Sequence, residues 1–159
     1  MEFIIRQGEI KDMGSVIELI QELAAFEKEP DAVEIDMYDL IKEGFTPNPS
    51  FKSFVAEMND EIVGMALFYQ RFSTWKGKSI HLEDLIVQKN KRGLGIGKAL
   101  YREFLQYAYN QKAKRVEWVV LNWNTDAIAF YEKSGASVLT DWRTVQMNEK
   151  SLENFIKNI

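Results

Sequence analysis

The chain has 159 residues, 46% of them hydrophobic and 28% charged, and its 24 acidic and 20 basic side chains give a net charge of −4. Because cores divide only beyond roughly 250 residues, this length predicts one domain, 1–159. The negative balance argues against a nucleic-acid partner. The chain has no cysteine and a single histidine, His81, which excludes disulfides, thiolate or histidine-rich metal sites and a cysteine nucleophile, so we expect no metal.

No segment contains 18 consecutive apolar residues, and charges interrupt the apolar run at 1–6. We therefore expect neither a transmembrane helix nor a secretory signal, and hence no membrane partner and a cytoplasmic location. The sequence shows no internal repeat, linker or low-complexity segment, which favours one compact domain.

In the first half of the chain, apolar residues at helical spacing predict a helix from Asp12 to Phe26. Asp36, followed by Asp39 three residues later, predicts the capped start of a short helix that ends at Gly44. The other expected elements are a strand at 3–6, a loop with two prolines at 46–50, and an antiparallel hairpin with strands at 51–58 and 61–72.

In the second half, strands alternate with helices. We expect a strand at 79–87, a helix at 95–110, a strand covered on both faces at 114–121, a helix at 124–134, short strands at 137–140 and 144–147, and a helical turn at 151–156. This order predicts a mixed α/β fold, with a twisted central sheet that contains a parallel crossover and is flanked by helices.

Three glycines, Gly93, Gly95 and Gly97, lie where the strand at 79–87 leads into the next helix. Glycines let the backbone approach a ligand, and a helix N-terminus adds N–H groups and partial positive charge. Four cations surround them, at Lys89, Lys91, Arg92 and Lys98. The combination predicts a phosphate or pyrophosphate site; the alternative is a flexible turn with a solvated basic rim. Neither the P-loop nor the dinucleotide-binding glycine pattern is met.

The run Arg92-Gly93-Leu94-Gly95-Ile96-Gly97 resembles the acetyl-CoA signature of the GNAT superfamily of N-acetyltransferases. Leu82-Glu83-Asp84, and the segment from Trp123-Asn124 through Phe130-Tyr131 to Gly135-Ala136-Ser137, resemble the diamine branch, the spermidine/spermine and thialysine N-acetyltransferases.

The resemblance implies the GNAT fold, with acetyl-CoA as co-substrate in the splay between the parallel strands at 79–87 and 114–121. We also expect a homodimer. The residues implied in acetyl-CoA binding are Leu85, Ile86, Val87, Arg92, Gly93, Leu94, Gly95, Ile96, Gly97, Lys98, Asn124 and Ala127.

Glu83 and Asp84 stand in the middle of a predicted strand, where acidic residues are disfavoured. Alternation would place Glu83 beside His81 on one face and Asp84 on the other. One explanation is a solvated face or an ion pair. The other is chemical, because an ammonium with a pKa of about 10 must lose its proton before its nitrogen can attack a thioester. The resemblance implies that Glu83 is this base and that Asp84 orients the amine.

Tyr131 lies near the end of the helix expected at 124–134, where an aromatic side chain can simply pack in the core. A tyrosine hydroxyl can also give a proton to the departing CoA thiolate, and the resemblance implies this role. Because the chain has no cysteine, an acyl-cysteine intermediate is excluded, and we expect direct attack of the amine in a ternary complex.

The acidic stretch between Glu27 and Asp39 would attract a polycation, although such charge runs are usually solvated surface. Tryptophans can line a slot for cationic chains or simply pack in the core. Acceptor contacts are expected at Glu27, Trp75, Glu83, Asp84, Trp123 and Trp142. Ser73, Phe26 and Thr125 depart from the acidic or tyrosine residues of the polyamine enzymes, so the acceptor amine stays open.

The expected function is an acetyl-CoA-dependent N-acetyltransferase that acts on a primary amine of a small molecule: a diamine, a polyamine or a lysine analogue. Two alternatives remain. A protein or peptide N-acetyltransferase would need a broad acidic groove. A non-catalytic acetyl-CoA-binding regulatory module would bind acetyl-CoA without amine-dependent release of CoA.

Overall fold

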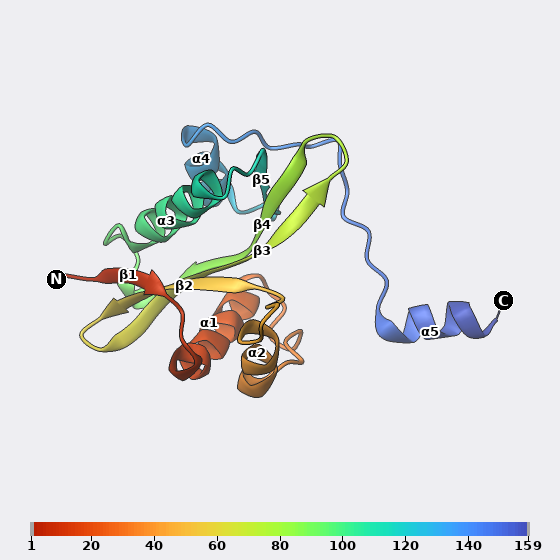
Figure 1. Cartoon of the computed structure of the whole chain (residues 1–159), viewed down its shortest axis with the longest axis horizontal. Coiled ribbons are helices and arrows are strands. Elements are labelled where there is room, and N and C mark those ends of the chain that lie inside the picture. The colour runs from red at the N-terminus through yellow and green to blue at the C-terminus, as the bar shows by residue number, and fades with distance from the viewer. Residues whose placement is uncertain (1, 159) are drawn as a thin grey trace. The chain divides into compact units, whose positions relative to one another are not determined.

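The computed structural model describes residues 2–158, in two compact units, Met1–Val119 and Val120–Ile159. The first unit is a five-stranded sheet, in the order β1-β2-β3-β4-β5, with helices on both faces (Figure 1). This is the mixed α/β architecture that the sequence predicts. Among the described residues, no helix is both long and apolar enough to cross a membrane. The assignment of 1–159 to one domain stays a prediction.

The N-terminal elements of the first unit agree with the sequence. They are β1 (Ile4–Gln7), the 3-10 turn η1 (Ile10–Asp12), α1 (Met13–Phe26) and α2 (Met37–Gly44). The Asp36 carboxylate accepts the N–H groups of Tyr38 and Asp39, and Asp39 accepts the N–H of Asp36 in return. This reciprocal capping box is what fixes the start of α2.

The strands β2 (Lys52–Met58), β3 (Glu61–Ser73) and β4 (Gly77–Val87) continue the sheet, each antiparallel to its predecessor. Asn59 and Asp60 form the β2–β3 turn with φ of 52° and 64°. Positive φ at both central residues matches the right-handed twist of the strands. The strand β5 (Arg115–Glu117) pairs in parallel with β4, which confirms the predicted crossover through α3 (Ile96–Asn110).

The prediction of a strand at 114–121 that is covered on both faces is wrong in both length and burial. Only Arg115–Glu117 is a strand, its residues are half-buried, and Val119 is 71% exposed. Three residue pairs hold it to β4, from Ser79↔Arg115 to His81↔Glu117. The apolar residues after Glu117 resemble a buried strand, but without a continuing neighbour their backbone cannot extend the ladder.

The two faces of the sheet carry different cores. Met65, Leu67 and Ile86 belong to one buried cluster, which also contains Met13 and other residues of α1 and Leu40 of α2. On the opposite face, Phe68 packs against Phe104 of α3, with ring centroids 5.4 Å apart. Residues that alternate along β3 therefore face α1 on one side and α3 on the other.

A bulge in β4 corrects the predicted alternation. Phe68 pairs with Leu82 and Leu67 pairs with Asp84, so Glu83 is an extra residue between them. Because paired residues point to the same face, Asp84 joins Leu67 on the α1 face instead of following Leu82 to the α3 face. His81 pairs with Tyr69, and both also lie on the α1 face.

The second unit contains α4 (Thr125–Lys133) and α5 (Glu149–Lys157), which confirms both predicted helices. The α4 helix begins with the Asn124 side chain as its cap and is followed by Gly135 at φ 95°. The strands expected at 137–140 and 144–147 are wrong, because these segments are irregular and pair with nothing in the described chain; Val145, for example, is 91% exposed. Alternating residues form a strand only where a neighbouring strand accepts their hydrogen bonds.

Candidate active site

Three carboxylates come together on the α1 face of the sheet. Glu83 occupies the β4 bulge and is half exposed, whereas Asp84 beside it is half-buried. Glu27 caps the C-terminal end of α1, and its charge acts on Asp84 together with that of Glu83. Although three acids meet, the described residues contain no group of three or more His, Asp or Glu side chains placed to hold a metal ion. The arrangement suits a cationic amine.

Burial raises the pKa of Asp84 to about 7, and the negative charges of Glu83 and Glu27 add to this shift. Burial also raises the pKa of Glu27. Both effects disfavour the ionised carboxylates. A carboxyl group that titrates near neutral pH can both attract an ammonium and hold a proton.

Glu83 is held by two ring side chains. Its Oε2 lies 3.6 Å from His81 Nε2, and the His81 and Tyr69 rings are 5.1 Å apart. Burial lowers the pKa of His81, opposed in part by Glu83. Burial also raises the pKa of the Tyr69 hydroxyl, and so do the charge of Glu83 and a hydrogen bond to it. The bulge thus presents Glu83 toward His81 and Tyr69.

The glycine loop, residues 88–95, leads directly from these carboxylates to α3. Gly93 and Gly95 have φ of 81° and 83°, and a Cβ at either would meet no atom within 4 Å. Backbone conformation, not space, therefore requires glycine at both positions. The first intrahelical bond runs from Ala99 N–H to Gly95 O, so the preceding N–H groups of α3 are not used within the helix. This geometry fits an anion such as a pyrophosphate.

Gly97 differs from the two glycines before it. It has a helical conformation, and a Cβ there would make only an ordinary contact with Val87 Cγ2 at 3.6 Å. Neither strain nor crowding within the described residues therefore accounts for glycine at this position.

Arg92 is the best-anchored cation of the loop. Its Nε donates to Val87 O at 3.0 Å, and its guanidinium lies 5.1 Å from the centroid of the Phe26 ring. Glu22 of α1 accepts the N–H of Lys89 at 2.8 Å and lies 4.0 Å from Arg92. The loop is therefore linked to α1 at Lys89 and Arg92.

The edge of β4 beyond His81 does not pair with β5, although β4 continues to Val87. Leu85, Ile86 and Val87 therefore have backbone groups on that edge that the sheet does not use. The Ile86 side chain is buried in the α1-side core, and Ile96 is buried at the start of α3. Only the backbones of these two residues can reach a ligand.

Two predicted acceptor-side positions lie at the β3–β4 turn, away from the carboxylates. Trp75 is 78% exposed, and the Ser73 hydroxyl accepts the N–H groups of Trp75 and Lys76 at 3.2 and 3.1 Å. Gly77, beside the turn, is seven residues from Asp84 along β4, or about 20 Å at strand spacing. The backbone of this turn is thus well separated from Asp84 along the strand, and the role of Trp75 stays a prediction.

The remaining predicted residues belong to the second unit. Asn124 Oδ1 accepts the N–H of Ala127 at 3.4 Å, and the ring of half-buried Tyr131 lies edge-on to Phe130. Trp123 precedes α4, and Trp142 lies between the two helices of this unit, 69% exposed. Their predicted roles stay predictions.

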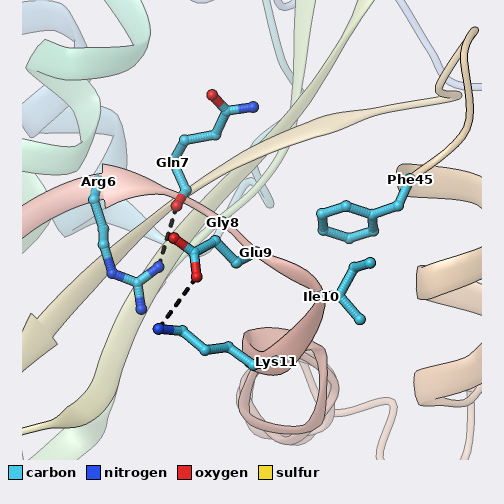
Figure 2. Close-up of a pocket in the computed structure, with 7 residues that line it drawn as sticks. All are labelled: Arg6, Gln7, Gly8, Glu9, Ile10, Lys11 and Phe45. Carbon is cyan, nitrogen blue, oxygen red and sulfur yellow. Dashed lines mark hydrogen bonds and ion pairs between the residues drawn. The ribbon is translucent and has the colours of Figure 1, made fainter.

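A pocket of about 590 Å³ lies elsewhere, between the end of β1, η1 and the end of α2 (Figure 2). None of the predicted site residues lines it. Arg6 in its wall pairs with Asp12 and Glu57 and donates to the carbonyl of Gln7, while Lys11 pairs with Glu9. Its charged groups therefore have partners within the protein.

Sequence reasoning missed a second charged group, which we name the arginine patch: Arg71, Ser79, His81, Arg115 and Glu117. Register places Arg71 opposite Ser79 and Arg115 beside Ser79, while Glu117 lies beside His81. All five therefore share the α1 face. Glu117 pairs with both Arg71 and Arg115. No local sequence pattern predicts this group, because its residues come from three different strands.

Known proteins share both sequence and fold with this chain. The model of the Acetyltransferase (GNAT) family matches residues 17–136. Thialysine N-epsilon-acetyltransferase of Bos taurus is 35% identical over 89% of this chain and 88% of its own length. Spermidine/spermine N(1)-acetyltransferase-like protein 1 of Homo sapiens is 34% identical over 94% of this chain, which spans only 23% of that relative. An integron cassette protein of V. cholerae has the same fold, with a TM-score of 0.80 at 22% identity over 99% of both chains.

Proposed function

The chain belongs to the acetyltransferase (GNAT) family, and we propose that it transfers the acetyl group of acetyl-CoA to a primary amine of a small molecule: a diamine, a polyamine or a lysine analogue. The observation that carries this proposal is the cluster of Glu27, Glu83 and Asp84 at the strand that leads into the glycine loop. The names of the similar proteins, a thialysine and a spermidine/spermine enzyme, also describe cationic amines.

Bound acetyl-CoA supplies the acetyl group as a thioester. In this proposal the N–H groups at the start of α3, with Arg92 and Lys98, hold the pyrophosphate, which the anchored loop and its positive φ glycines support. The unpaired edge at Leu85, Ile86 and Val87 offers backbone groups to the extended arm. Gly93, Leu94, Gly95, Ile96 and Gly97 form the cradle, and Asn124 and Ala127 contribute from the start of α4.

In this proposal Glu83 and Asp84 have different roles toward the amine. An alkyl ammonium has a pKa of about 10, so at neutral pH it arrives protonated and cannot act as a nucleophile. We assign to Glu83 the acceptance of this proton and to Asp84 the orientation of the amine, with Glu27 adding negative charge. Because the pKa of Asp84 is about 7, Asp84 is the second group able to take the proton.

Tyr131 is proposed to donate its hydroxyl proton to the departing CoA thiolate. Since the chain has no cysteine, no acyl-cysteine can form, and the neutral amine attacks directly while both substrates are bound. The ammonium gives up two protons in all: one goes to the carboxylates before the attack, and the second leaves the nitrogen as the tetrahedral adduct collapses. The thiolate takes one proton from Tyr131, and the second proton from nitrogen restores the Tyr131 hydroxyl, so protons and charge balance.

A thiol-release assay with acetyl-CoA tests the proposal against its two alternatives. We expect CoA release that depends on diamines, polyamines or lysine analogues and stays at background without acceptor. Release with peptides but not with small amines would indicate a protein N-acetyltransferase. Acetyl-CoA binding without release by any amine would indicate a regulatory module.

A further inference from the structure

His81 has no role in the proposed reaction, yet it lies against the carboxylate that is to accept the proton of the amine. Its Nε2 is 3.6 Å from Glu83 Oε2, and 12% of its side chain is exposed, against 51% for Glu83. Tyr69 lies opposite His81 in the β3–β4 ladder, with the two rings 5.1 Å apart, and also hydrogen-bonds to Glu83. A half-exposed, flexible carboxylate therefore has two packed rings beside it.

The second ring nitrogen, His81 Nδ1, belongs to a group of buried polar atoms in the arginine patch. The described residues supply no hydrogen-bond partner for four of these atoms: Ser79 Oγ, His81 Nδ1, Arg115 Nε and Glu117 Oε1. Glu117 Oε1 forms an ion pair with Arg71, without a hydrogen bond between them. In the parallel ladder Ser79 lies beside Arg115, and His81 beside Glu117. Because buried polar groups are nearly always hydrogen-bonded, the four atoms call for a partner from outside the protein.

The chemistry of the four atoms identifies that partner as water. Arg115 Nε can only donate a hydrogen bond, Glu117 Oε1 can only accept one, and the Ser79 hydroxyl can do either. An anion would suit Arg115 but not Glu117, and a cation would meet the reverse difficulty. Water donates two hydrogen bonds and accepts two, and buried waters bridge polar groups that the chain leaves unpaired. Paired strand residues lie about 5 Å apart and same-face neighbours along a strand about 7 Å, so one or two waters can reach all four atoms.

We propose that His81 is a positioning residue for Glu83. Buried water at Nδ1 fixes the tautomer that carries its proton on Nε2, and this N–H holds the Glu83 carboxylate toward the amine. The inference rests on the proposed function, because Glu83 is taken there to accept the proton of the amine. In a neutral imidazole one nitrogen donates and the other accepts, and the partner of one nitrogen decides the state of the other. Glu83 Oε2 is an acceptor, so Nε2 carries the proton and Nδ1 accepts from water.

A neutral His81 can hold Glu83 without cancelling its charge. Burial lowers the pKa of His81, while the charges of Glu83, Arg71 and Glu117 act on it in opposing directions, so the ring is neutral at neutral pH. An imidazolium would instead form an ion pair with Glu83 and make it a weaker base. At 3.6 Å the contact is slightly longer than a hydrogen bond, and contacts of this kind shorten when substrate binds. Holding Glu83 in place beforehand reduces the side-chain entropy that it loses on meeting the amine.

The tautomer can be read directly, because His81 is the single histidine of the chain. Protein labelled with ¹⁵N-histidine gives one imidazole in a long-range proton–nitrogen NMR spectrum, recorded at pH 7.5 without substrates. We expect a neutral ring with its proton on Nε2, and an Nδ1 shift typical of a nitrogen that accepts a hydrogen bond. A proton on Nδ1, an imidazolium at this pH, or an Nδ1 without a hydrogen bond would overturn the inference.

A matched pair of substitutions tests the effect on the reaction. In His81→Gln the side-chain amide nitrogen reaches the place of Nε2, so a donor toward Glu83 is kept, whereas the shorter side chain of His81→Asn reaches only the place of Nδ1. Both variants lose the ring that packs on Tyr69. His81→Asn should lower kcat/KM for the amine about tenfold, the effect of losing a hydrogen bond to a charged group, and His81→Gln should stay within about twofold of wild type. Acetyl-CoA binding should be unchanged in both.

Equal losses in the two variants would overturn the inference, since they would show that His81 packs or takes the proton itself. Undiminished activity in His81→Asn would overturn it too. The NMR measurement separates this inference from the proposed function, because it needs no reaction. If no amine releases CoA, the proposed function is refuted, and a proton on Nε2 would still support the contact with Glu83. Amine-dependent CoA release that is equal in His81→Gln and His81→Asn would refute the role of His81 alone.

Discussion

Replacement of Asp84 by asparagine tests the carboxyl on which the proposed acceptor site depends. Burial, together with the charges of Glu83 and Glu27, raises the pKa of Asp84 from 3.8 to about 7. Between these two values the folded protein holds a proton that the unfolded chain has released, so the stability of the wild type falls as the pH rises through this window. Over the whole window the loss is about 4 kcal/mol. Asparagine has the same size as aspartate but no charge, so the Asp84→Asn variant should not show this loss of stability.

Urea unfolding at pH 5 and at pH 8.5 measures the effect. Part of the loss is already present at pH 5, so the stability of Asp84→Asn relative to wild type should increase by about 2.5 kcal/mol between the two pH values. Asp31→Asn, which alters an exposed carboxylate in the loop after α1, is the control and should show no such increase. A stability difference between Asp84→Asn and wild type that is the same at both pH values would refute the raised pKa.

Three further substitutions test the proposed catalytic and binding roles. Glu83→Gln should lower kcat/KM strongly near pH 7 and less toward pH 10. It should also lower the pKa of Asp84, because a neighbouring negative charge is lost. A plot of kcat/KM against pH that runs parallel to that of the wild type would rule out the base role. Tyr131→Phe should lower kcat about 10²-fold with little change in acetyl-CoA binding, and an undiminished kcat would assign Tyr131 to packing alone. Gly97→Ala should raise the KM for acetyl-CoA several-fold without loss of stability, while Gly14→Ala, a helical control that also makes only ordinary contacts, should leave KM unchanged; a normal KM in Gly97→Ala would refute the close approach.

Local chemistry was enough to predict most elements from the sequence. The apolar spacing of α1 and α3, the capping pair Asp36 and Asp39, and the Asn59-Asp60 turn are decided within a few residues of chain. The glycine loop belongs to the same class, because positive φ at Gly93 and Gly95 is a property of the residue type. The GNAT resemblance rests on that loop, and the family match confirms it.

Strand pairing, in contrast, depends on residues far apart in the chain. The pattern of 114–121 is that of a buried strand, yet β5 ends at Glu117 because its ladder with β4 stops there. The bulge at Glu83 follows from the register with β3, and it moves Asp84 to the α1 face. There burial, together with the charges of Glu83 and Glu27, raises the pKa of Asp84. A shift of one residue reverses the face of every side chain that follows, and alternation alone cannot reveal it.

The sequence by itself therefore determined the class of fold, the position of the glycine loop and the acidic pair Glu83 and Asp84. The tertiary structure decided which side chains surround that pair. Arg71 and Glu117 are 46 residues apart and meet only because β3 and β5 flank β4 in the sheet. Charges brought together by strand order have no signature in a local stretch of sequence, so the arginine patch could be found only in the folded chain.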